Sequence, residues 1–155
     1  MERKSLNTAS CSATEMPEPS LKPDFIWPVR VYWEDTDAGG VVYHASYVRF
    51  LERARSEWLR SIGIGQGLLR SQSGIIFVVH RIEMDFLKPA QLDDLLNVSV
   101  RPIAARGASF TVIQELRRES ETQVRVAARV RIACLDADRF RPRPLPPFIL
   151  SEIAA

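Results

Sequence analysis

The sequence predicts an α+β domain in which one long helix lies across a five-stranded antiparallel sheet. Three observations support this fold class. Only residues 46–62 have the apolar periodicity of a long helix, and a single strand-like segment precedes them. Four more strand-like segments follow. The connections between these four are too short to cross over a sheet, so neighbouring strands must run antiparallel.

The first strand is predicted over residues 26–34. From Val29 to Glu34 apolar side chains alternate with polar or larger ones, which is the period of a half-buried strand. Pro28 lacks a backbone N–H and suits the start or the edge of a strand. The strand is expected to end where Asp35 and Asp37 begin.

The long helix is expected to begin at Ser46 as its N-cap and to end before Gly63. Its apolar face is spaced by three and four residues and contains one charged residue, Arg55. The face consists of Val48, Leu51, Ala54, Arg55, Trp58, Leu59 and Ile62. This side of the helix should pack on the sheet.

The remaining strands are predicted at residues 75–87, 95–101, 109–116 and 124–135. The turns between them lie at residues 88–90, 105–107 and 119–122. Residues 65–73 are expected to form an irregular or short helical connection, and the three tryptophans to pack in the core or an interface. The proline-rich end, residues 141–147, should lie on the surface and be anchored by Phe148 and Ile149.

The length of 155 residues suits one domain, which we place at residues 24–150 between a flexible tail (1–23) and a C-terminal end (151–155). A net charge of +2, spread along the chain, argues against nucleic-acid binding. No apolar run is long enough to span a membrane, and no apolar segment follows the first charges as in a signal peptide. The two cysteines, Cys11 and Cys134, fit neither a disulfide framework nor a metal site, which favours the cytoplasm.

Polar chemistry is concentrated in the loop before the long helix, where Asp35, Asp37 and His44 fall within ten residues. A carboxylate such as that of Asp37 can attack an ester or thioester, or activate a water molecule that does so. Unpaired N–H groups at the helix start, near residues 45–49, can polarise a carbonyl oxygen. Aspartate and glycine are also the commonest turn residues. The residues alone therefore support a structural turn as well as a hydrolase.

A resemblance to a known family favours the hydrolase. The segment contains Asp35-Thr36-Asp37-Ala38-Gly39-Gly40 and then Tyr43-His44, and similarity continues through residues 86–94 (FLKPAQLDD) and 106–110 (RGASF). These motifs resemble the 4-hydroxybenzoyl-CoA thioesterases, which have the hotdog fold, and in particular the branch associated with the bacterial Tol-Pal envelope system. The resemblance implies that Asp37 is the catalytic carboxylate and that His44 takes part in catalysis.

The same resemblance implies hydrolysis of an acyl-CoA, or of an acyl carrier protein thioester, without a metal or a bound cofactor, because coenzyme A arrives with the substrate. Candidate substrate-binding residues are Gly40, Tyr43, Arg106 and Ser109. Such proteins are homodimers or homotetramers with active sites between subunits. Two alternatives remain: a non-catalytic acyl-binding or scaffold protein working with envelope or lipid-synthesis partners, and a hotdog enoyl-thioester hydratase.

Three arginines of the last predicted strand, Arg125, Arg129 and Arg131, share one face. They are expected to form a solvated outer surface. Contact with CoA phosphates or with an acidic carrier protein is the alternative.

Overall fold

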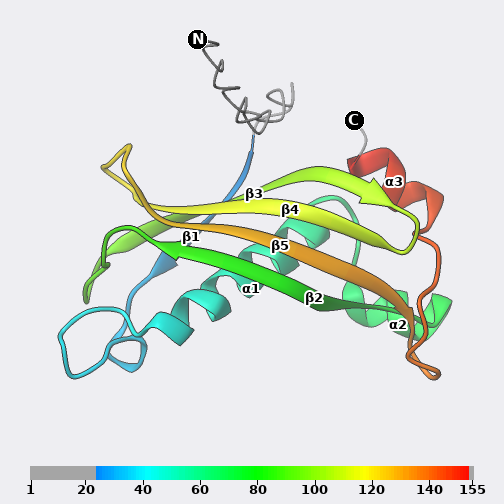
Figure 1. The fold of residues 1–155 in the computed structure, drawn as a ribbon, viewed down its shortest axis with the longest axis horizontal. Helices are drawn as coiled ribbons and strands as arrows, with labels where there is room; N and C mark the ends of the chain where they lie inside the picture. The colour runs from blue at the N-terminus through cyan, green and yellow to red at the C-terminus, as the bar shows by residue number, and fades with distance from the viewer. Residues whose placement is uncertain (1–23, 154–155) are drawn as a thin grey trace, which may run out of the picture.

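A computed structural model describes residues 24–153 and confirms the predicted fold class (Figure 1). Its strands are β1 (Phe25–Arg30), β2 (Ile75–Phe86), β3 (Leu95–Arg106), β4 (Ser109–Arg118) and β5 (Val124–Asp136). The helices are α1 (His44–Ser61), α2 (Gln66–Ser73) and α3 (Pro147–Ile153), with a 3-10 turn at Trp33–Asp35. The predicted tail, residues 1–23, lies outside the described residues.

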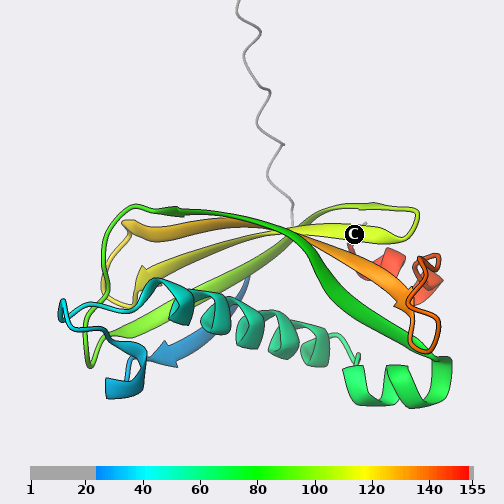
Figure 2. The ribbon, with the colours of Figure 1, turned by 60° about the horizontal axis from the view of Figure 1, so that its bottom comes forward.

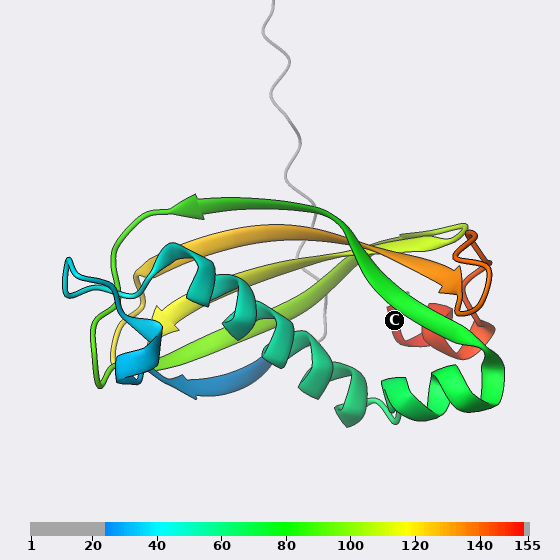
Figure 3. The same cartoon turned by 90° about the horizontal axis from the view of Figure 1, so that it is seen from below.

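All five strands form one antiparallel sheet in the order β1-β3-β4-β5-β2. The first two strands of the chain therefore lie at opposite edges, and helix α1 connects the two sides. Figures 2 and 3 show α1 running beneath the curved sheet, with α2 continuing from its C-terminal end. The strand that leads into the predicted catalytic loop is thus separated from the edge strand β2 by the width of the sheet.

The core lies between α1 and the facing side of the sheet. Phe50, Leu51 and Ala54 on α1 are fully buried, as are Val98 on β3 and Val130 on β5. Burial of each large apolar side chain contributes roughly 1.5–3 kcal/mol, so this contact holds the helix on the sheet. The apolar face predicted for the helix is confirmed from Leu51 to Leu59. It is wrong at Val48, which is 41% exposed, and Ile62 lies just past the end of the helix.

The segment before α1 differs from its prediction. The strand ends at Arg30. The N–H of Val31 still donates to the carbonyl of Asp94, just before β3, and Trp33–Asp35 then turn into a 3-10 helix. Trp33 is 79% exposed in this chain, so of the two places predicted for it, the core and an interface, the core is excluded. The predicted N-cap at Ser46 is also wrong: Tyr43 occupies that position, and the N–H of Ser46 donates to its carbonyl.

The later elements are close to their predicted ranges. The connection at residues 65–73 is largely helical, and α3 runs past the domain boundary placed at residue 150. Ile149 is fully buried, as expected of an anchor, whereas Phe148 is 50% exposed on another side of the same short helix. Strand β3 extends through Arg106, and Gly107 takes the left-handed conformation at the turn into β4.

A buried polar group links α1 to the middle of the sheet. Only 5% of Arg55 is exposed, and its Nη1 donates to Oε1 of Gln114 at 2.8 Å. The amide of Gln114 in turn donates to the carbonyl oxygens of Leu51 and Ser99. Burial lowers the pKa of Arg55, and the neighbouring Glu52 carboxylate, to which Arg55 is ion-paired, acts in the opposite direction.

This contact can be tested by replacing Gln114 with leucine, which has a similar volume. The change leaves a buried guanidinium short of one partner, and we expect it to lower the free energy of unfolding by roughly 2–4 kcal/mol in urea titrations. Arg53→Gln, at an exposed position of the same helix, should change it by less than about 0.5 kcal/mol. Equal stability of the Gln114 variant and the wild type would show that Arg55 does not depend on Gln114.

Candidate active site

Asp35 is an anchor of the loop between β1 and α1. It is buried, and its Oδ2 accepts the N–H of Tyr32 at 2.9 Å. Its backbone carbonyl accepts the N–H of Tyr43 at 2.8 Å, and its Oδ1 pairs with Arg49 at 3.4 Å. With both oxygens occupied inside the fold, the first aspartate of the motif joins the loop to the start of the helix.

Asp37 has the opposite environment, because its side chain is exposed at the tip of the loop. Oδ1 accepts the N–H of Gly39 at 2.8 Å, and the backbone closes a turn in which Gly40 donates to the Asp37 carbonyl at 3.0 Å. Gly40 has φ = 77°, a left-handed conformation that favours glycine. No described residue hydrogen-bonds Oδ2 of Asp37, so one carboxylate oxygen is free to react.

The N-terminus of α1 supplies unpaired donors. The helix begins at His44, and its first turn contains no acidic side chain. Among the described residues, the N–H groups of His44 and Ala45 have no backbone acceptor, while that of Ser46 is taken by Tyr43. Ala45 lies within residues 45–49, where the sequence predicts such donors, and His44 lies one residue before that range. The helix dipole also favours negative charge at this end.

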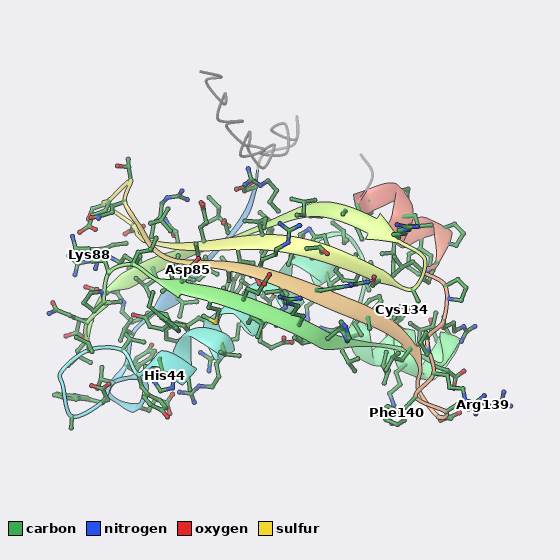
Figure 4. The ribbon with its side chains drawn as sticks, in the orientation of Figure 1. His44, Asp85, Lys88, Cys134, Arg139 and Phe140 are labelled. Atoms are coloured by element: carbon green, nitrogen blue, oxygen red, sulfur yellow. The ribbon has the colours of Figure 1, made fainter. Side chains whose placement is uncertain are left out.

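A hollow of about 290 Å³ brings Asp37 and His44 together. It lies between the predicted catalytic loop, which joins β1 to α1, the first turns of α1 and the segment that follows β2. Its lining consists of Asp37, Val41, Val42, His44, Tyr47, Phe86, Leu87, Lys88 and Pro89. Figure 4 shows His44 and Lys88 at the same end of the molecule. The wall combines apolar side chains with a few polar ones, a composition that suits an acyl group attached to a reactive carbonyl.

Tyr47 was not among the residues predicted for the site, yet it lines this hollow and is only 3% exposed. Its hydroxyl accepts the N–H of Ala90 at 3.0 Å, and the carbonyl of Ala90 accepts the N–H of Val42 at 2.8 Å. Burial raises the pKa of Tyr47, partly offset by the hydrogen bond from Ala90. A signal was present in the sequence: Tyr47 follows His44 by three residues and so shares its side of the helix.

The predicted substrate-binding residues are divided between two places. Gly40 lies in the catalytic loop, and the Tyr43 ring packs on the imidazole of His44 with centroids 4.4 Å apart. Arg106 and Ser109 instead line a separate hollow of about 300 Å³ on the outer face of the sheet, which is turned away from α1. The lining consists of Arg81, Glu83, Ala104, Arg106, Ser109, Thr111, Arg129 and Arg131. Within one chain, Arg106 and Ser109 do not meet Asp37.

Arg125 does not belong to the solvated surface expected for it. Its side chain is 3% exposed, ion-pairs with Glu121 and donates to the carbonyl of Pro89. It therefore supports the segment that forms one wall of the Asp37 hollow. Arg129 and Arg131 are exposed, as expected.

No group of three or more His, Cys, Asp or Glu side chains that could hold a metal ion occurs in residues 24–153. None of the helices in this part of the chain has the length and apolarity needed to cross a membrane.

A long helix wrapped by an antiparallel sheet, with a free carboxylate beside the helix N-terminus, defines the class of hotdog-fold thioesterases. Residues 31–153 match the family model described as the thioesterase-like superfamily, and the chain belongs to this family.

Individual relatives agree with this assignment. The chain is 44% identical to the acyl-CoA thioester hydrolase YbgC of Escherichia coli O6:H1 over 83% of its length and 94% of that protein. It is 43% identical to the acyl-CoA thioesterase YbgC of Haemophilus influenzae over 81% of its length and 91% of that protein. Among solved structures, a probable thioesterase from Bartonella henselae is 40% identical, with a TM-score of 0.75 over 80% of this chain and 100% of that one.

The contact between Tyr47 and Ala90 gives a prediction for stability. Tyr47→Phe keeps the ring but leaves the buried N–H of Ala90 without an acceptor, and we expect a loss of about 1–3 kcal/mol in the free energy of unfolding. Tyr43→Phe is the matched control, since no described residue hydrogen-bonds the Tyr43 hydroxyl. If both variants unfold at the same urea concentration as the wild type, the hydrogen bond between Tyr47 and Ala90 does not stabilise the fold.

Proposed function

We propose that the protein hydrolyses an acyl-CoA thioester to a free acid and a thiol. The observation that carries this proposal is the free Oδ2 of Asp37 beside the unpaired N–H groups of His44 and Ala45 in a largely apolar hollow. A thioester hydrolase needs these three features: a base or nucleophile, donors for the developing oxyanion and a surface for the acyl chain. Relatives that share more than 40% of their residues with the chain are named as acyl-CoA thioester hydrolases.

Asp37 acts in one of two ways. As a general base, it takes a proton from a water molecule whose oxygen attacks the carbonyl carbon. The tetrahedral intermediate then expels the CoA thiolate as the C–S bond breaks. As a nucleophile, it displaces the thiolate itself and forms a mixed anhydride, which water hydrolyses to the acid. In both routes we propose that the N–H groups of His44 and Ala45 stabilise the oxyanion and that the His44 imidazole passes a proton to the departing sulfur.

We propose that a second copy of the chain completes the pocket, as a homodimer or within a homotetramer. Asp37 and His44 are exposed in a single chain, although catalysis gains from the exclusion of water. The hollow adjoins β2, an edge strand with unpaired backbone groups and the exposed apolar side chains of Val79 and Phe86, and Leu87, the next residue after the strand, is exposed as well. An edge of this kind is a ready template for pairing with another strand.

The arginine-rich hollow on the outer face of the sheet has a suitable composition for the phosphates of coenzyme A, or for an acidic acyl carrier protein. Glu83 is its only carboxylate and is paired with Arg81. Arg131 donates to the Ser109 hydroxyl, whereas Arg106 makes no side-chain hydrogen bond with any described residue. Because this hollow and Asp37 lie on opposite faces of one sheet, Arg106 and Ser109 would serve substrate bound by a neighbouring copy.

We also assign the protein to the Tol-Pal-associated branch of the 4-hydroxybenzoyl-CoA thioesterases and to the cytoplasm. The motif from Asp35 to His44 supports the branch, and the buried free thiol of Cys134 suits a reducing compartment. We expect no bound cofactor, because neither of the two routes proposed for the hydrolysis needs one. A non-catalytic acyl-binding protein and an enoyl-thioester hydratase are the competing functions, and neither would release free thiol.

The proposal is tested by thiol release from a panel of short, long and aromatic acyl-CoAs. Asp37→Asn should lower kcat by about 10²–10⁴-fold, because the amide can neither attack nor take a proton. The control is Asp93→Asn, an exposed aspartate with φ = 69° that asparagine tolerates; it should turn over normally. Unchanged turnover in Asp37→Asn would remove Asp37 from the mechanism, and a wild type inactive on every thioester would favour the binding protein.

The role of the outer hollow is tested by Arg106→Gln. Loss of one charge-assisted hydrogen bond to a phosphate should raise KM for acyl-CoA by roughly tenfold. An acyl-pantetheine substrate, which lacks the nucleotide phosphates, should give the same KM with variant and wild type. Arg53→Gln on α1 controls for the loss of one positive charge. An equal change of KM on both substrates would contradict a phosphate contact at Arg106.

A further inference from the structure

The loop between β5 and α3 holds a bulky residue in an unfavourable conformation. Phe140 has φ = 52°, a left-handed backbone that side chains branching into a large ring rarely adopt. Its ring is 66% exposed and so gains little from burial in this chain. Strain of this kind persists only where the surroundings impose it, and it concentrates at sites that bind something.

The loop is rigidly held. Oδ1 of Asp136 accepts the N–H groups of Asp138 at 3.1 Å and Arg139 at 2.9 Å. The carbonyl of Asp136 accepts the N–H of Phe140, and its N–H donates to the carbonyl of Arg141, both at 2.9 Å. The hydrogen bonds from the N–H groups of Arg139 and Asp138 lower the pKa of Asp136, and the charges of Arg139 and Arg143 act in the same direction. Phe140 is therefore presented to solvent by a fixed turn.

This turn projects from the end of the molecule opposite to the catalytic loop. Figure 4 shows Arg139 and Phe140 at that end, far from His44, and Figure 1 shows α2 and α3 at the same end. Beside the turn lies a hollow of about 400 Å³, lined by Gly67, Arg70, Ser71, Gly74, Ala137 and Asp138. The site is thus distinct from both hollows assigned to the thioester substrate.

Positive charge dominates this surface. Within residues 24–153, the guanidinium groups of Arg70, Arg139 and Arg141 have no hydrogen-bond or ion-pair partner, and all three are exposed. Arg143 nearby donates to the carbonyl of Ser73 at 2.7 Å. Asp138 is the only carboxylate that lines the hollow. The unpaired guanidinium groups of this surface therefore favour an anionic ligand.

We propose that the turn at residues 136–141, together with the hollow beside α2, docks on the surface of an anionic phospholipid bilayer. A lipid interface offers phosphates and an apolar layer next to each other, which matches guanidinium groups beside an exposed aromatic ring. Phe140 enters the interface, and a headgroup phosphate binds at Arg70. An acidic protein would need an apolar cavity for Phe140 in addition to its charges. A free phosphate would make no use of the ring.

Vesicle sedimentation of the full-length protein tests the proposal. We expect the protein to sediment with phosphatidylcholine vesicles that contain phosphatidylglycerol and to stay in solution with phosphatidylcholine alone. Binding should weaken as sodium chloride is raised, because salt screens the arginines. A wild type that remains in solution with the anionic vesicles would overturn the proposal.

Two variants measure the contributions of the Phe140 ring and of the Arg70 charge to vesicle binding separately. Phe140→Asn keeps a residue that tolerates positive φ and removes the ring, so the dissociation constant should rise roughly tenfold while the fold is preserved. Arg70→Gln should raise it about fivefold. The controls are Trp33→Ser, an exposed aromatic at the other end of the molecule, and Arg53→Gln on α1. Both should bind as the wild type does, and urea unfolding verifies that all four variants fold.

The remaining outcomes contradict the proposal. If Arg53→Gln weakens binding as much as Arg70→Gln, attraction is diffuse rather than located at this turn. If Phe140→Asn binds normally and inorganic phosphate displaces the protein more than chloride of equal ionic strength, the ligand is a soluble anion. Neither result depends on thioester hydrolysis.

Discussion

The hydrogen bonds that Ala90 makes in two directions hold the candidate site together. Its N–H donates to the Tyr47 hydroxyl on α1, and its carbonyl accepts the N–H of Val42 in the catalytic loop. Ala90, in the segment after β2, therefore fixes the helix, the loop and the pocket wall relative to each other. The position of Asp37 against the helix N-terminus follows from this contact, because residues 37 and 41 are themselves joined by a backbone hydrogen bond of 3.0 Å.

The two aspartates of one short motif divide structural and chemical roles through burial. Asp35 is enclosed, and its oxygens are taken up by Tyr32 and Arg49. Asp37, two residues later, keeps an oxygen that no described residue binds. A loop that must hold a reactive group in a fixed place needs both: an anchor whose hydrogen bonds are satisfied inside the fold and a carboxylate whose bonds are left for substrate.

The elongated shape of the domain separates its surfaces. The proposed thioester site lies at the end where α1 begins and β2 finishes, and the proposed lipid contact lies at the end where α1 leads into α2 (Figure 1). Helix α1 spans the distance between them, and the bond from Arg55 to Gln114 ties its middle to the sheet. A protein docked through residues 136–141 would keep the Asp37 end away from the bilayer and open to substrate.

The sequence by itself determined the fold class, the central part of the apolar face of α1 and the segment that contains Asp37 and His44, because periodicity and turn composition are local properties. It could not place Tyr47, whose partner Ala90 is 43 residues away, nor show that Arg125 is buried against Pro89. It also grouped Arg106 and Ser109 with Asp37, although they lie on the other face of the sheet. These facts depend on which strands become neighbours and which way their side chains point, and only the packed tertiary structure decides that.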